Sequence, residues 1–222
     1  MHGVSVSVLV PAAGQGSRLG RGPKAFVRVG GRTLLEWTLA AFGWADEVWV
    51  ALPPGMAQPR PSERVGFVRG GSERQESVAR LLARARGDVV LVHDAARPFV
   101  VRSVIDRLLE AVALYGAAVP VLPVPDTLIE PEEGRYGPAL DRSRYALVQT
   151  PQAFFREVLA EAHELARTRS LTATDEAQLV QALGYPVELV PGDRRMFKVT
   201  YPEDLELAEA LARGWPPEPK RA

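Results

Sequence analysis

Short apolar runs alternate with longer amphipathic segments along most of this chain, and the alternation limits the folds open to it. Apolar, β-branched runs indicate buried strands, and strands that alternate with helices of about ten residues or more build βαβ units around a mainly parallel sheet. We therefore predict an α/β fold, a single Rossmann-like, doubly wound domain over residues 1–222. The predicted strands are 4–10, 26–29, 47–52, 65–69, 89–93, 117–124, 187–190 and 196–199, and the predicted helices are 34–42, 78–85, 104–115, 156–167, 177–183 and 203–212.

The loop after the first predicted strand carries the strongest functional signal. It reads Pro11-Ala12-Ala13-Gly14-Gln15-Gly16-Ser17-Arg18 and is followed by Pro23-Lys24. Small residues let backbone N–H groups approach a ligand, and Arg18 and Lys24 add positive charge, so we predict a polyphosphate ligand. The loop lacks the Gly-Lys-Ser/Thr ending of a P-loop, and its third glycine comes one residue late for the dinucleotide fingerprint. A loop whose glycines only make a tight turn is the alternative.

Three further polar motifs follow predicted strands. They are Gly70-Gly71-Ser72-Glu73-Arg74-Gln75-Glu76-Ser77, His93-Asp94-Ala95-Ala96-Arg97-Pro98 and Asp126-Thr127. In a parallel sheet, ligands bind beyond the carboxyl ends of the strands. We therefore expect all four motifs to gather at one edge of the sheet and form one site.

Composition excludes several classes of protein. The 27 basic and 27 acidic residues give zero net charge, so bulk charge indicates neither a nucleic-acid partner nor a membrane partner. Without cysteine there is no disulfide, thiolate nucleophile or zinc-thiolate site. The first residues lack a signal-peptide layout and no apolar run approaches about 20 residues, so we expect a cytoplasmic protein.

Residues 125–145 break the alternation, because they show no helical period. A structureless loop of this length is uncommon in a compact domain, so we predict a protruding β-hairpin arm that turns at 131–134. A lone hairpin exposes strand edges, and most small homo-oligomers are two-fold dimers, so we expect the arm to reach onto the partner of a homodimer. We expect the tail, residues 214–222, to be frayed.

Taken together, the motifs resemble those of the 2-C-methyl-D-erythritol 4-phosphate cytidylyltransferase family, in family order from residue 11 to residue 200. The matching stretches also include Thr150-Pro151-Gln152, Thr174-Asp175-Glu176 and Lys198-Val199-Thr200. The resemblance implies transfer of CMP from CTP to 2-C-methyl-D-erythritol 4-phosphate, with release of pyrophosphate, in non-mevalonate isoprenoid synthesis. At Ser72 the sequence departs from the family pattern, because some members carry an acidic residue at this position. The departure concerns one contact to the ribose or the base and not the reaction.

The resemblance also implies roles for individual residues. The catalytic set is Arg18, Lys24 and Lys198. The nucleotide-binding set is Ala12, Ala13, Gly14, Gly16, Gly71, Ser77 and Asp94, and the acceptor-binding set is Arg97, Thr127, Arg142 and Thr150. Asp94 is the predicted ligand of Mg²⁺ or another divalent cation, because Mg²⁺ uses few carboxylates and much water. The arm implies a homodimer in which Arg142 completes the partner's acceptor site.

Each of these roles has a plainer alternative. The alternative role of Lys198 is that of a solvated residue on an edge strand, and the alternative role of Asp94 is that of a helix-capping or loop-bracing residue. The alternative for Arg142 is a surface residue paired with Asp141. We leave His93 out of the site, because a single histidine on a strand is more often a hydrogen-bonded core residue than a ligand.

Other functions compete with the predicted reaction. The same chemistry on another polyol phosphate, such as ribitol 5-phosphate, is the nearest. A catalytically idle nucleotide-binding domain and a dinucleotide-dependent oxidoreductase belong to other classes; Lys24, Asp94 and Lys198 argue against the first, and the misplaced glycine argues against the second.

Overall fold

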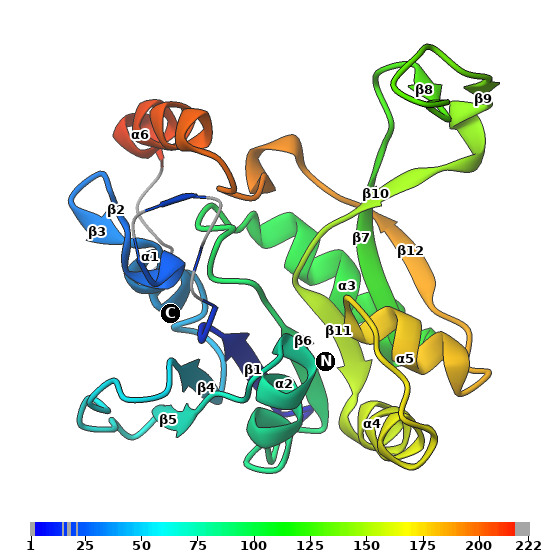
Figure 1. The fold of residues 1–222 in the computed structure, drawn as a ribbon. Coiled ribbons are helices and arrows are strands. Elements are labelled where there is room, and N and C mark those ends of the chain that lie inside the picture. The colour runs from blue at the N-terminus through cyan, green and yellow to red at the C-terminus, as the bar shows by residue number, and fades with distance from the viewer. Residues whose placement is uncertain (1–2, 15, 17–18, 21, 216–222) are drawn as a thin grey trace.

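A computed structural model of the chain describes residues 3–14, 16, 19–20 and 22–215. Within these residues an eight-stranded sheet forms the centre of the molecule (Figure 1). Its order is β10-β7-β11-β6-β1-β4-β5, and β12 pairs with β7. The strands are β1 (Val6–Pro11), β4 (Glu47–Leu52), β5 (Val65–Arg69), β6 (Val89–Val92), β7 (Ala117–Pro123), β10 (Ala146–Val148), β11 (Gln152–Phe155) and β12 (Glu188–Pro191).

Most of the strand order follows the parallel pattern predicted from the sequence. β1 pairs in parallel with β4 and β6, β4 with β5, and β12 with β7. The exceptions are β10 and β11, two strands that the sequence analysis did not identify. β10 pairs antiparallel with β7, and β11 lies antiparallel between β6 and β7. The β11 segment is short and runs directly into a helix, so no turn residue separates the two elements. The predicted doubly wound α/β fold is confirmed.

Helices cover both faces of the sheet. Within β1, Val8 and Val10 pack with α1 (Leu34–Ala41) and α3 (Arg102–Tyr115). Leu9 points to the opposite face and packs with α2 (Arg74–Leu82), α4 (Arg156–Arg169) and α5 (Glu176–Ala182), as the alternation of a strand requires. A third cluster around Phe99 joins α6 (Pro202–Gly214) to the small sheet of β2 (Arg28–Val29) and β3 (Arg32–Thr33). In the part of the chain that the structure describes, no helix is long and apolar enough to cross a membrane.

Two helix starts test the sequence predictions. Thr33 caps α1 in a capping box: its hydroxyl accepts from the Glu36 N–H at 3.1 Å, and the Glu36 carboxylate accepts from the Thr33 N–H at 2.6 Å. By contrast, α2 begins at Arg74, four residues before the predicted start. The side chains of its first turn bind polar partners, so the apolar period that predicts the helix begins only at Val78.

The predicted strand 196–199 is wrong. This segment follows a 3₁₀ helix, η4 (Arg194–Met196), and takes no strand pairing. Met196 and Val199 are buried, and the Val199 N–H donates to the Ala96 carbonyl at 2.8 Å. The apolar residues that suggested a strand therefore anchor a loop.

The predicted hairpin arm is confirmed. It carries β8 (Leu128–Ile129) and β9 (Ala139–Leu140), which pair antiparallel, and a 3₁₀ helix, η3 (Arg142–Arg144). The turn lies at Glu133 and Gly134, whose φ angles of 47° and 81° suit the turn of a tight hairpin. Figure 1 shows the arm projecting from the body of the molecule.

The predicted frayed tail lies mostly beyond the described region. Residues 216–222 are outside the described residues. Gly214 is the last residue of α6, and the Trp215 ring lies with its centroid 5.0 Å from that of Phe99.

Candidate active site

A cavity of about 270 Å³, called the main cavity below, opens at the carboxyl ends of β1 and β6. Its walls come from the loops that follow these strands, from the loop and first turns of α2, and from the segment after η4. The predicted site residues that line it are Ala12, Ala13, Gly14, Gly16, Lys24, Gly71, Ser77, Asp94 and Lys198. Arg18 lies outside the described residues. Asp126 and Thr127 lie on the arm, outside this lining.

Two loops approach each other closely to form one wall. A side chain at Gly70 would place its Cβ 2.3 Å from the Ala13 Cβ, so the absence of a side chain lets the loops touch. The Ser77 hydroxyl accepts from the Gly71 N–H at 3.0 Å and donates to the Glu73 carbonyl at 3.1 Å. Ser77 is therefore held inside the α2 turn, and the wall presents small residues and backbone to the cavity.

Ser72, where the sequence departs from the family pattern, belongs to the same wall. Its N–H and its hydroxyl both donate to one Glu76 oxygen, at 2.7 and 2.9 Å. Glu76 also pairs with Arg80 on the next turn of α2. The loop is thus closed by a local carboxylate one turn into the helix.

Asp94 lies at the centre of an ionic network on the cavity floor. Its Oδ1 accepts from Arg74 Nε at 3.1 Å, and its Oδ2 accepts from Lys198 Nζ at 2.6 Å. Burial alone would raise the pKa of the Asp94 carboxyl, but the positive charges of Arg74 and Lys198 hold it below its usual range. Asp94 is therefore ionised at neutral pH.

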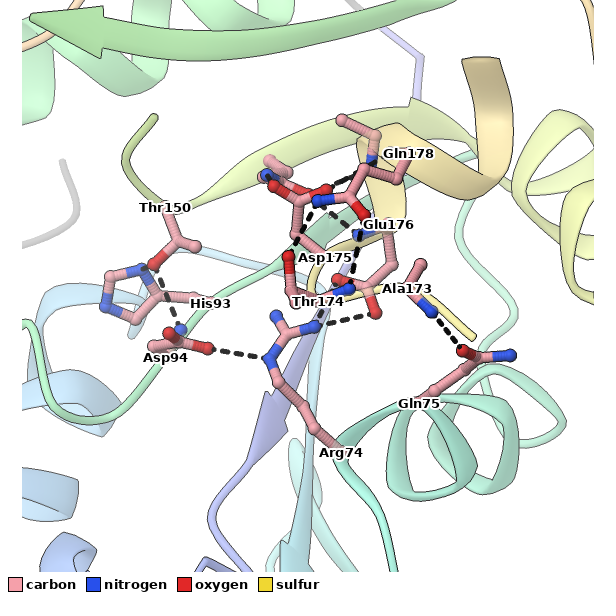
Figure 2. Close-up of polar contacts among 12 residues, drawn as sticks. Arg74, Gln75, His93, Asp94, Thr150, Ala173, Thr174, Asp175, Glu176 and Gln178 are labelled. Atoms are coloured by element: carbon pink, nitrogen blue, oxygen red, sulfur yellow. Dashed lines mark hydrogen bonds and ion pairs between the residues drawn. The ribbon is translucent and has the colours of Figure 1, made fainter. Parts of the chain in front are cut away.

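The network extends to Glu176, to which the sequence analysis gave no role in the site. Arg74 Nη1 donates to the two Glu176 oxygens at 2.9 and 2.8 Å, so one guanidinium joins two carboxylates (Figure 2). Burial raises the pKa of the Glu176 carboxyl, while Arg74 acts in the opposite direction. The sequence signals were its place in the family-matching stretch Thr174-Asp175-Glu176 and its acidic side chain at the start of a helix, and neither indicated that the carboxylate is buried.

His93 lies beneath Asp94 and is fully buried, as expected for a core residue. One ring nitrogen, Nε2, donates to the Arg97 carbonyl at 3.0 Å, which leaves Nδ1 as the acceptor of the Thr150 hydroxyl at 3.3 Å. Burial lowers the pKa of His93 to about 4, so the ring is neutral. The Thr150 hydroxyl in turn accepts from the Asp94 N–H at 3.1 Å and fixes the backbone of the aspartate.

Comparisons with known proteins agree with this geometry. The sequence profile described as IspD: 2-C-methyl-D-erythritol 4-phosphate cytidylyltransferase matches residues 6–214. The chain belongs to this family. A 2-C-methyl-D-erythritol 4-phosphate cytidylyltransferase of Thermus thermophilus is 63% identical over 96% of this chain and 99% of its own length. One of Deinococcus radiodurans is 52% identical over 92% of this chain and 88% of its own length.

Solved structures place the same family on this fold. The crystal structure of the Thermus thermophilus cytidylyltransferase superposes with a TM-score of 0.87 and 61% identity, covering 94% of this chain and 99% of that one. The bifunctional IspDF of Campylobacter jejuni superposes with a TM-score of 0.77 at 28% identity, and the match covers 91% of this chain and 53% of that longer one. The fold class and the family predicted from the sequence are both confirmed.

The four residues expected to bind the acceptor of this cytidylyltransferase fall into two groups. Thr150 and Arg97 lie near Asp94 and already make bonds within the chain. Arg97 donates from Nη1 to the Met196 carbonyl at 2.8 Å and from Nη2 to the Val148 carbonyl at 3.3 Å, while its buried Nε has no hydrogen-bond partner among the described residues. Thr127 and Arg142 are exposed on the arm, and Arg142 Nη1 donates to the Pro125 carbonyl at 2.5 Å. None of the four lines the main cavity, so their acceptor-binding role stays a prediction.

The donor set of the cavity suits Mg²⁺ bound together with phosphate. Among the described residues, no three His, Cys, Asp or Glu side chains form a group able to hold a metal alone. Mg²⁺ often binds through one or two carboxylates and takes its other oxygens from phosphates and water. Asp94 fits this mode, because it is ionised and lines the main cavity.

Proposed function

We propose that this chain transfers CMP from CTP to 2-C-methyl-D-erythritol 4-phosphate, giving 4-diphosphocytidyl-2-C-methyl-D-erythritol and pyrophosphate, in the cytoplasm. The observation that carries the proposal is that Lys24, Lys198 and an ionised Asp94 line one cavity in a member of the cytidylyltransferase family. Transfer of a nucleotide between anions requires such cations, and the family supplies the identity of the two substrates.

The nucleophile is a phosphate oxygen of the acceptor. Because the second pKa of a phosphate monoester is about 6, this oxygen is already largely ionised at neutral pH and needs no general base. It attacks the α-phosphorus of CTP in line, and the bond from that phosphorus to the bridging oxygen of pyrophosphate breaks. The electron pair of the broken bond leaves with pyrophosphate, so the protein need only position the anions and neutralise their charge.

Lysines on the cavity walls perform that neutralisation. Lys24 begins a short 3₁₀ helix, η2 (Lys24–Phe26), after the glycine loop, and we assign it with Arg18 to the triphosphate. Lys198 reaches the floor from the opposite wall, and we assign it to the region where the acceptor and the α-phosphate meet. Negative charge grows on pyrophosphate as the bond breaks, so contacts from these cations strengthen in the transition state.

The small-residue wall suits the base and ribose of CTP. Ala12, Ala13, Gly14, Gly71 and Ser77 offer backbone donors and acceptors at close range, and backbone groups can distinguish the edge of cytosine without an aromatic stack. Asp94 is the residue of this chain that would hold Mg²⁺ beside the phosphates. The ion would supply additional charge neutralisation.

The arm supports a homodimer as part of the same proposal. Its return strand β10 is exposed over its whole length. Exposed apolar side chains lie along the arm and on the strands at its root: Tyr136, Tyr145, Leu147, Val148 and, on β12, Leu189. Exposed apolar patches of this kind suit a protein partner, and a two-fold axis would cover each arm with its copy. Thr127 and Arg142 would then serve the acceptor site of the partner subunit.

One assay tests the reaction directly. Pyrophosphate release from CTP is measured with 2-C-methyl-D-erythritol 4-phosphate, with ribitol 5-phosphate, and with no acceptor. We expect release only with an acceptor, and faster turnover with the methylerythritol phosphate. Faster turnover with ribitol 5-phosphate would reassign the acceptor, and no release with either would indicate an idle nucleotide-binding domain.

A further inference from the structure

Glu176 is a buried carboxylate with no part in the reaction proposed above. It is the first residue of α5 and is only 1% exposed. Its ionic partner is Arg74, which lies 102 positions away in the sequence. A buried ion pair contributes little to stability compared with a well-packed apolar pair, so stability alone gives no reason for this pair.

The position of the Glu176 carboxylate is fixed by the fold. Gln152 of β11 is itself 1% exposed, and its Oε1 accepts from the N–H groups of Glu176 and Ala177 at 3.2 Å each. Gln152 Nε2 donates to Asp175 at 3.1 Å, and Asp175 caps the same helix. The first turn of α5 is therefore tied to the central sheet.

A second set of bonds ties this region to α2 beside Arg74. Gln75 Nε2 donates to the Leu171 carbonyl at 3.0 Å. Gln75 Oε1 accepts from the Ala173 N–H at 3.0 Å, as Figure 2 shows. The segment before α5 thus cannot shift along α2 without breaking these bonds. Both ends of the Arg74–Glu176 pair are held in register by neutral amides.

The rigid pair determines the direction in which Arg74 points. A guanidinium is planar, so holding Nη1 on both Glu176 oxygens also sets where Nε points, which is toward Asp94 Oδ1 at 3.1 Å. The Arg74 side chain is 28% exposed and lines the main cavity, so the pair reaches the site itself. With Oδ1 held, Oδ2 faces Lys198.

We propose that Glu176 is a positioning residue for nucleotidyl transfer: through Arg74 it fixes the Asp94 carboxylate in the orientation that receives the metal-bound triphosphate. The proposal rests on the proposed function. It assigns no contact with substrate to Glu176. Glu176 acts through Arg74, because the planar guanidinium binds the two carboxylates with two different nitrogens in fixed relative positions, which the single ammonium nitrogen of a lysine does not reproduce.

The test uses Glu176→Gln, which keeps the shape of the side chain but removes its charge. The readout is the Mg²⁺ concentration for half-maximal CTP binding, measured by calorimetry on the full chain without acceptor. We expect this midpoint to rise about tenfold, the size of effect usual for outer-shell partners of metal ligands, and kcat to fall. Glu164→Gln, which breaks an exposed ion pair with Arg167, is the matched control and should overlay the parent.

A second variant keeps the test decisive. Arg74→Lys should raise the same midpoint, and adding Glu176→Gln to it should raise the midpoint no further, because the route through Arg74 is already broken. A folded Glu176→Gln chain whose Mg²⁺ midpoint equals the parent's would overturn the proposal; if that chain does not fold, an unchanged midpoint in Arg74→Lys would do so. A parent chain that releases no pyrophosphate with any acceptor would refute the proposed function instead.

Discussion

The floor of the main cavity and the arm are stabilised in opposite ways. On the floor, the bonds that join Arg74 to Asp94, Arg74 to Glu176 and Lys198 to Asp94 span 20, 102 and 104 positions of the sequence. In the arm, Arg142 bonds to Pro125 only 17 positions away, and the hairpin ladder is local. The floor therefore exists only in the completed fold, whereas the arm holds its shape with few contacts to the rest of the chain.

In the proposed reaction, the nucleotide and the acceptor are assigned to these two different regions. The residues predicted to bind the nucleotide are collected from distant elements of one chain, while Thr127 and Arg142 lie on an arm that points away. Variants on the floor should change chemistry within one subunit. Variants on the arm should act between subunits and leave the fold intact.

The largest effect is expected at the lysines of the cavity. Lys24→Ala and Lys198→Ala should each lower turnover about 10²–10³-fold, because each removes a charge contact that strengthens in the transition state. Arg18→Ala should do the same. Steady-state turnover, with thermal unfolding to verify the fold, tests this. Parent-like turnover in any two of the three variants would refute the assignment.

The next effect tests the division between subunits. Chains carrying Lys24→Ala and chains carrying Arg142→Ala, each inactive alone, are mixed and allowed to exchange. If Arg142 serves the partner's site, each mixed dimer has one intact site, and random reassortment recovers about a quarter of parental activity. Verified exchange without recovery would place both residues in the site of one subunit.

A smaller effect concerns His93 beneath the floor. Its folded pKa of about 4 lies below the ordinary 6.5, so the unfolded chain binds the proton first and stability falls as pH drops through this interval. Between about pH 6.5 and about pH 5, the titration of His93 lowers the free energy of unfolding by about 1.5 kcal/mol.

Denaturant titrations of the parent and of His93→Gln over this pH range measure the contribution. The parent should lose more stability than the variant on acidification. Glu176, whose pKa is raised, changes stability with the opposite sign in both proteins, so the difference between the two slopes isolates His93. Equal slopes would show that His93 does not carry the dependence.

The smallest effect is expected at the tip of the arm. Glu133 has a φ of 47°, which asparagine tolerates better than glutamate, so Glu133→Asn should stabilise the turn by about 0.5 kcal/mol. Hydrogen exchange of the arm amides should slow about twofold, with global unfolding unchanged. Faster exchange at the tip, or a shift in global stability, would show that the arm is not a local unit.

The same contrast explains how far the sequence could be interpreted. Patterns within a few residues were decisive for the start of the helix at Leu34 and for the turn at 131–134, and they placed the glycine loop after the first strand, where its described residues line the main cavity. The buried state of Glu176 and the pairing of β11 were not predictable, because each depends on partners far along the chain. The prediction of a strand at 196–199 failed for a related reason. The apolar residues of this segment anchor a loop through tertiary packing, and local periodicity cannot distinguish such a loop from a strand.

The root of the arm has a consequence for engineering and evolution. Pro123 of β7 and Ala146 of β10 are register partners, so the arm is an insertion into a hairpin that is already closed at its base. A change in the length of this insertion therefore leaves the strand order of the sheet unchanged. A chain in which a short turn replaces the insertion would give a separately tractable nucleotide-binding module, suited to ligand screening apart from subunit assembly.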